Sequence, residues 1–301
     1  MGIWGAMRDA ASLGTLWAVL TLGAFISYKV LDFPDLSVDG TFALGGAVSA
    51  TLIVKGMNPF LALPIAIMAG MLGGLCTALL HTKLKIPGLL SGILTMLALY
   101  SINLRIMSGS NKPLLGTNTA VKMLSAALGL SRTISILVIG SVTCALLVGA
   151  MYWFFGTELG CAIRASGDNP HMARALGTNT NNMIIIGLCL SNGLVALAGA
   201  LVAQGQGFAD VSMGTGAMVI GLASIIIGEV MFKWLGRNFA IRLLAVVLGA
   251  VLYRVIIAVV LQLGLKAEDF NMLSAMMMVI VMSVPLLRDK LRALIRGKEA
   301  E

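Results

Sequence analysis

Long apolar runs dominate the chain, in place of the short one-faced stripes of soluble proteins. Runs with few or no charges fall at about 13–28, 40–57, 59–80, 86–107, 134–155, 183–205, 214–232, 240–264 and 271–287. Each is near the ~20 residues that a helix needs to cross ~30 Å of hydrocarbon. Backbone groups in lipid must pair within their own segment, and the runs lack the period of two of barrel strands. The pattern therefore predicts an all-α polytopic membrane protein with about nine spanning helices (range eight to ten), in one transmembrane domain over residues 1–301.

Composition agrees with a membrane environment. Mean hydropathy is +0.97, 58% of the 301 residues are hydrophobic and 11% are charged, where a soluble domain carries roughly 25%. With the N-terminus outside, 13 of the 21 lysines and arginines fall on the inner side, seven fall outside and Arg254 lies within a span. This excess follows the positive-inside rule, so the net charge of +8 is read as orientation and no nucleic-acid partner is expected.

Chemistry-bearing motifs are scarce. The four cysteines are scattered without a metal-ligand spacing, and the sequence contains no P-loop, H-E-x-x-H or G-x-S-x-G motif. We therefore expect no cofactor, no metal site and no catalytic activity. A channel or a membrane-embedded enzyme lacks a filter sequence or catalytic constellation, which leaves transport of a small solute as the function to consider.

An internal similarity links two distant segments. Residues 35–49 read DLSVDGTFALGGAVS and residues 210–224 read DVSMGTGAMVIGLAS, and identities recur at an offset of 175. Each copy opens a predicted span, and the copies lie five spans apart, so they would run in opposite directions. Many transporters build two gates around a central site from such inverted repeats, and we expect them here.

The inner loop, residues 156–182, contains two short helix-compatible pieces around Gly167–Pro170. Asp168 or Asn169 can cap the second piece, with Pro170 in its first turn. Spacing alone leaves two interpretations open: a docking element that lies in a groove on a partner, or a plain connector.

A resemblance adds to this pattern. The string ELGCAIRASGDNPHMARALGTNT resembles the cytoplasmic coupling segment of ABC importer permeases of the branched-chain amino-acid and ribose type, and DLSVDGTFALGGAVSA is similar to their second-span signature. The similarity is closest to the bacterial branch with a lipoprotein-like solute receptor and a separate ATPase. It implies a cell-membrane (inner-membrane) importer in which two permease copies pair, an external binding protein delivers solute, and ATP-binding subunits grip the coupling segments. Transferred by position, the ATPase contact would comprise Glu158, Arg164, Asp168, Asn169, Met172, Ala173, Arg174 and Gly177.

The translocation pathway is assigned to polar residues near the glycine-rich parts of the second and seventh runs. Asp39 lies among them, and our candidates are Asp35, Ser37, Thr41, Gln204, Gln206, Asp210, Ser212 and Thr215. The alternative is that they are loop and cap residues. Glu229 and Arg254 lie within predicted spans, where a charge must face protein or water, and we assign them gating or structural roles.

Three further expectations complete the prediction. The tail, residues 286–301, has leucines on one face and arginines on another, as in a helix lying on anionic lipid. The resemblance favours an amino acid, in particular an aromatic one, as solute, with a nucleoside or a sugar as the alternative. It also favours a homodimer as the assembly. The main alternative function is an ion-coupled secondary transporter, which would transport solute without an ATPase.

Overall fold

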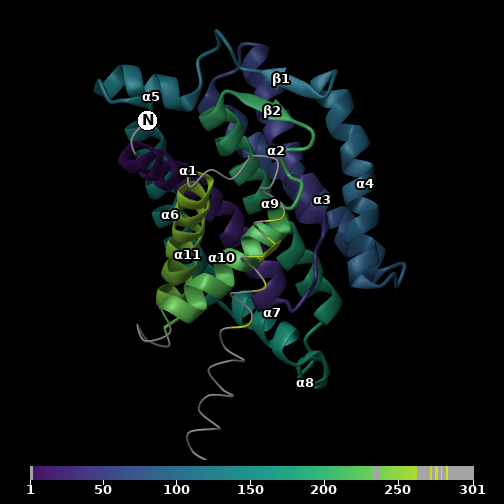
Figure 1. The fold of residues 1–301 in the computed structure, drawn as a ribbon. Helices are drawn as coiled ribbons and strands as arrows, with labels where there is room; N and C mark the ends of the chain where they lie inside the picture. The colour runs from purple at the N-terminus through teal and green to yellow at the C-terminus, as the bar shows by residue number, and fades with distance from the viewer. Residues whose placement is uncertain are drawn as a thin grey trace, which may run out of the picture.

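The structure is a computed structural model of the chain, and it describes residues 3–232 and 238–262 together with the single residues 272, 275, 276, 279 and 283. The described part is almost entirely helical (Figure 1). Its elements are α1 (Ile3–Phe25), continued by the π-helix η1 (Ile26–Val30), α2 (Ser37–Val54), α3 (Pro59–Thr82), α4 (Gly88–Met107), β1 (Asn111–Pro113), α5 (Ala120–Leu128), α6 (Arg132–Phe155), α7 (Glu158–Asp168), α8 (Pro170–Ala175), α9 (Thr180–Gln206), β2 (Phe208–Asp210), α10 (Ala217–Met231) and α11 (Phe239–Gln262).

Seven helical segments of the described chain are long and apolar enough to cross a membrane: α1 with η1, α2, α3, α4, α6, α9 and α11. The prediction of an all-α polytopic membrane protein is thereby confirmed. The ninth predicted run, 271–287, lies outside the described residues apart from the five single helical positions, and the tail 286–301 lies wholly outside them.

The predicted span 214–232 forms a shorter helix than expected. Its helix, α10, has 15 residues, or about 22 Å at 1.5 Å per residue. The preceding residues leave the helical conformation because Gly207 and Gly216 adopt φ values of +89° and +76°, and β2 lies between them. Helix α10 therefore begins inside the bundle.

The bundle has two distinct ends (Figure 1). At one, β1 pairs antiparallel with β2, with Asn111 opposite Asp210 and Pro113 opposite Phe208, and α5 lies at this same end. At the other lie α7 and α8. We call these the ribbon end and the coupling end. The ribbon joins the connection after α4 to the connection after α9, which are far apart in sequence.

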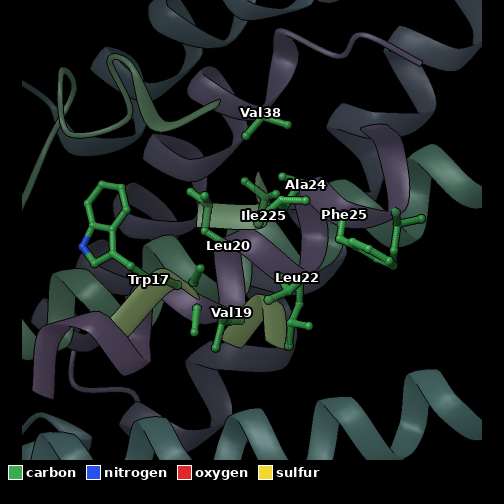
Figure 2. Packing of buried hydrophobic residues seen from close by; sticks show 14 of the residues in the cluster. Trp17, Val19, Leu20, Leu22, Ala24, Phe25, Val38 and Ile225 are labelled. Carbon is green, nitrogen blue, oxygen red and sulfur yellow. The ribbon is translucent and has the colours of Figure 1, made fainter. Parts of the chain in front are cut away.

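Helices α1, α2 and α9 form the centre of the bundle. Within their most apolar windows 78%, 72% and 67% of residues are buried, against 28–33% for α3, α4 and α6. Figure 2 shows the aliphatic side chains of α1, such as Leu20 and Leu22, gathered with Ile225 of α10 and Val38 of α2. The peripheral helices α3, α4 and α6 expose apolar side chains on the surface of the bundle.

Small residues let the central helices approach closely. A Cβ atom added at Gly45 would overlap the carbonyl of Ala196, and one added at Gly199 would overlap the carbonyl of Phe42. Backbones of α2 and α9 therefore touch without intervening side chains, as small residues allow in membrane helices.

Contacts along these helices give their directions. Near the start of α2, Ser37 donates a hydrogen bond to Asn192 in the middle of α9. Further along α2, Ser49 accepts a hydrogen bond from Gln204 near the end of α9. The two helices are therefore parallel, and both run toward the ribbon end. Helix α10 begins beside Asp39 of α2 and runs the opposite way, because Glu229 near its end pairs with Lys29 in η1.

Candidate functional site

The coupling segment folds as two short helices with a turn between them. Thr157 caps α7 by accepting a hydrogen bond from the N–H of Gly160 at 3.3 Å. Asn169, one of the two predicted caps, begins α8 by accepting from the N–H of Met172 at 3.0 Å, and Pro170 is the first residue of the helix. The sequence prediction of two helical pieces is confirmed, since a side-chain cap followed by proline favours a new helix start.

One side of α7 is built into the bundle. Ile163 is fully buried, and the glycines at 160 and 167 lie so close to other segments that a Cβ would overlap the carbonyls of Phe154 and Val30, respectively. Helix α7 therefore packs against the end of α6 and against the π-helix η1. Because η1 continues α1, the coupling segment is in direct contact with the end of that spanning helix.

The opposite side of the segment is exposed. Seven of the eight residues assigned to the ATPase contact are exposed: Glu158, Arg164, Asp168, Asn169, Met172, Arg174 and Gly177. Ala173 differs, because it is buried and its carbonyl accepts the N–H of Thr178 at 3.0 Å. Apolar side chains accompany the polar ones, since Leu159, Met172 and Leu176 are 51%, 53% and 76% exposed. The result is a mixed apolar and charged surface, which we call the coupling surface.

The coupling segment also contacts the start of helix α11. The guanidinium of Arg164 lies 5.2 Å from the ring centroid of Phe239 at the start of α11. Beside them is a cavity of about 390 Å³ lined by Tyr152, Trp153, Phe155, Gly156, Thr157, Arg164 and Phe239. Nearby, Glu229 of α10 pairs with Lys29 at 2.8 Å and with Arg242 at 3.2 Å. The ion pairs join η1, α10 and α11 at the coupling end.

The predicted pathway residues at the start of α2 lie in the packed interior. Asp35 accepts hydrogen bonds from the backbone N–H of Ser37 at 2.9 Å and from the Nδ2 of Asn192 at 2.7 Å. Asp35, Ser37 and Thr41 are fully buried, and the hydroxyl of Thr41 has no hydrogen-bond partner. Asn192 was absent from our candidates, although an asparagine inside the apolar run 183–205 is a signal that could have identified it.

Gln204 joins three segments near the ribbon end. Its side-chain amide donates to the hydroxyl of Ser49 at 3.0 Å and to the carbonyl of Pro59 at 3.3 Å, and its oxygen accepts the N–H of Ala120 at 3.0 Å. Gln206 is half-buried, and its carbonyl accepts from Arg132 at 3.1 Å. Gln204 is thus fully engaged in joining α2, α3 and α5 to α9.

The remaining pathway candidates lie at the ribbon end, apart from the Asp35 group. Asp210 belongs to β2 and is half-buried, whereas Ser212 and Thr215 are exposed. The carboxylate of Asp210 accepts from the N–H of Ser212 at 2.7 Å and from its hydroxyl. The same Asp-x-Ser turn forms at Asp35 and Ser37, so the two similar segments of the sequence share a local hydrogen-bond pattern.

Asp39 joins the two similar segments. Its carboxylate accepts the N–H of Gly216 at 2.9 Å and the N–H of Met218 at 2.8 Å, and so caps the first turn of α10. A carboxylate at a helix N-terminus accepts hydrogen bonds from N–H groups that the helix itself leaves unpaired. Its negative charge also interacts favourably with the positive end of the helix dipole. Asp39 directly precedes the predicted run 40–57, and an acidic side chain at that position was the available signal.

Glu229 and Arg254, grouped together from sequence, occupy different places. Glu229 forms its pairs at the coupling end, whereas the Arg254 guanidinium lies 4.0 Å from the ring centroid of Trp17 in α1. Among the described residues, no group of three or more histidine, cysteine or acidic side chains is arranged to hold a metal ion.

Comparison with known proteins identifies the family. Residues 6–282 match the sequence profile of the branched-chain amino acid transport system permease component. A tyrosine transport system permease protein of Clostridioides difficile (strain R20291) is 39% identical over 262 residues, covering 87% of this chain and 85% of that protein. An uncharacterised protein, RP368, of Rickettsia prowazekii (strain Madrid E) is 35% identical over 88% of this chain and 92% of its own length.

A more distant relative is the autoinducer 2 import system permease protein LsrC of Yersinia pestis (strain Pestoides F), 29% identical over 84% of this chain and 69% of that protein. No solved structure matches the chain. The family resemblance seen in the sequence is confirmed. The chain belongs to the branched-chain amino acid transport system permease family and is a multi-pass protein of the inner membrane.

Proposed function

We propose that this chain is the membrane-spanning subunit of an ATP-driven importer and that the coupling surface docks a separate ATP-binding subunit. The observation that carries the proposal is the two-sided coupling segment. One side is packed on α6 and η1, and the other exposes Leu159, Met172 and Leu176 among charged residues. A plain connector has no need of such an ordered, partly apolar surface, whereas a helix gripped in a groove does.

The assembly that follows contains further partners. The coupling end faces the cytoplasm, and the ribbon end faces an external solute-binding protein. A second copy of the chain completes the translocation pathway, and ATP hydrolysis is left to the partner subunit. In this arrangement α2 and α10 move as parts of two inverted halves around a site that includes the polar residues of α2 and α9.

An aromatic amino acid is the solute we propose. The support is the relative named as a tyrosine transport permease, which aligns with most of this chain. The proposal therefore concerns a zwitterionic solute with a carboxylate and a flat side chain.

Substitutions on the coupling surface test docking. Met172→Asp and Leu176→Asp place charges on its apolar part, and each is expected to reduce co-purification of the ATP-binding subunit at least tenfold. Leu115→Asp is the matched control, because Leu115 is 87% exposed but lies between β1 and α5 at the ribbon end. It should leave co-purification unchanged.

Uptake distinguishes the two classes of transporter. In proteoliposomes, the assembled complex is expected to accumulate tyrosine only with ATP inside the compartment that the coupling end faces. Uptake by the chain alone under a proton or sodium gradient would contradict the proposal and favour an ion-coupled carrier.

A further inference from the structure

Arg254 lies deep within a spanning helix and is stacked on an aromatic ring. It follows Phe239, at the coupling end of α11, by 15 positions, which places it about 22 Å along the helix. Its guanidinium carbon lies 4.0 Å from the ring centroid of Trp17 on α1, and the Trp17 ring packs 5.0 Å from that of Phe42 on α2. Residues from three helices thus form one cation–aromatic cluster.

The cluster holds a positive charge with no anion beside it among the described residues. Both ion pairs found among the described residues involve Glu229, which lies at the coupling end. The Arg254 Nε and the Trp17 Nε1 are both buried and have no hydrogen-bond partner. A stacked ring offsets part of the desolvation of a guanidinium, but it accepts no hydrogen bond in the plane of the cation. Buried donors left unpaired are destabilising.

These unsatisfied groups are all donors, and that restricts the ligand. A guanidinium and an indole N–H would both be satisfied by a hydrogen-bond acceptor on the ligand. The positive charge of the guanidinium favours an acceptor that is an anion. A carboxylate supplies two coplanar oxygens that match the guanidinium edge in a bidentate pair. The ring of Trp17 fixes the plane of the guanidinium, so the direction in which the carboxylate would bind is set before the ligand arrives.

We propose that Arg254, oriented by Trp17, binds the carboxylate of the transported solute and makes the permease selective for carboxylate-bearing molecules. This inference rests on the proposed function and deepens it. It replaces the gating or structural role assigned to Arg254 from sequence with direct solute recognition. Trp17 acts as a positioning residue that also offers a second donor.

Binding to the purified permease–ATPase complex without the receptor tests the site. Three probes compete with labelled L-tyrosine: unlabelled L-tyrosine, tyramine, which lacks the carboxylate, and 3-(4-hydroxyphenyl)propionate, which lacks the amine. In the wild-type complex both carboxylates should displace the label at concentrations at least tenfold below that of tyramine. Arg254→Gln should raise the tyrosine Kd at least tenfold and abolish the preference over tyramine.

Two variants complete the test. Arg254→Lys retains a positive charge but loses the planar stack on Trp17. It should raise the tyrosine Kd severalfold while keeping part of the preference over tyramine. This variant decides the question if the Arg254→Gln variant does not assemble. Arg8→Gln, at an exposed position of α1, is the matched control and should behave as wild type. Wild-type affinity and preference in both Arg254 variants, or tyramine binding as well as tyrosine in the wild type, would overturn the inference.

The wild-type uptake assay separates the two proposals. If wild-type complex transports no amino acid with ATP, the proposed function fails. If it transports tyrosine and both Arg254 variants keep wild-type affinity and carboxylate preference, the proposed function stands and only the role of Arg254 is lost.

Discussion

Asp35 and Asn192 are joined by a hydrogen bond of 2.7 Å although they are 157 positions apart in the chain. The bond connects the start of α2 to the middle of α9, and both residues are fully buried. Asn192 also donates to the carbonyl of Leu188 at 3.1 Å. A single amide therefore ties the segment that enters α2 to the central helix of the bundle.

Removal of this amide should destabilise the bundle. Asn192→Ala leaves a buried carboxyl without one of its donors, which we expect to reduce the free energy of unfolding by about 1–2 kcal/mol. The midpoint of thermal unfolding in detergent, followed by a thiol-reactive dye, should fall. Asn181→Ala, at an exposed position of α9, is the control and should have no effect. An equal change in both variants would argue against the bond.

The cap on α10 gives a second prediction. Asp39→Ala removes the acceptor of the Gly216 and Met218 N–H groups, and loss of an N-cap costs about 0.5–2 kcal/mol. Amide hydrogen exchange in the first turn of α10 should become faster, while exchange in α6 should not change. Asp39→Asn retains one acceptor oxygen and should show a smaller effect. Unaltered exchange at residues 216–220 in the alanine variant would contradict the capping role.

Gly167 should be intolerant of a side chain. Its Cβ position overlaps the Val30 carbonyl, so Gly167→Ala must move α7 away from η1. We expect the complex to retain ATPase activity but to lose most of its ATP-driven uptake, because the contact through which movement of α7 would reach α1 is displaced. Gly149→Ala in α6 is the matched control, since a Cβ there meets nothing within 4 Å. Normal uptake by the Gly167 variant would show that this contact transmits nothing.

The ion pairs of Glu229 should affect coupling more than stability. Lys29 and Glu229 are 32% and 28% exposed, and partly exposed pairs contribute less than about 1 kcal/mol. Glu229→Gln should therefore leave the unfolding midpoint nearly unchanged. The number of solute molecules transported per ATP should fall, since η1, α10 and α11 are no longer joined at the coupling end.

A double-mutant cycle with Lys29→Gln checks this prediction. If the two residues act through their pair, the double variant should transport as poorly as the worse single variant. Independent, multiplying losses would indicate that each residue acts separately.

The membrane class, most of the spans and the coupling helices were predictable from sequence. Apolar runs of about twenty residues have one solution in lipid, the helix, and Asn169 with Pro170 marks a helix start through local hydrogen bonding alone. The runs 40–57 and 134–155 accordingly appear as α2 and α6 with small shifts at their ends. The same reasoning overestimated α10, because hydrophobicity does not reveal that residues 214–216 lie outside the helix, where Gly216 adopts a positive φ.

What the sequence by itself determined is thus the local and compositional part: which segments are helical, that they lie in a membrane, and where the second helix of the inner loop begins. The tertiary structure alone decided which polar residues meet. Asp39 accepts a hydrogen bond from Gly216, the N-cap of α10, which lies 177 positions later. Arg254 stacks on Trp17 rather than lying near Glu229. The physical reason is that such pairings depend on how apolar helices stack. Close packing at Gly45 and Gly199 selects that arrangement, and no local pattern encodes it.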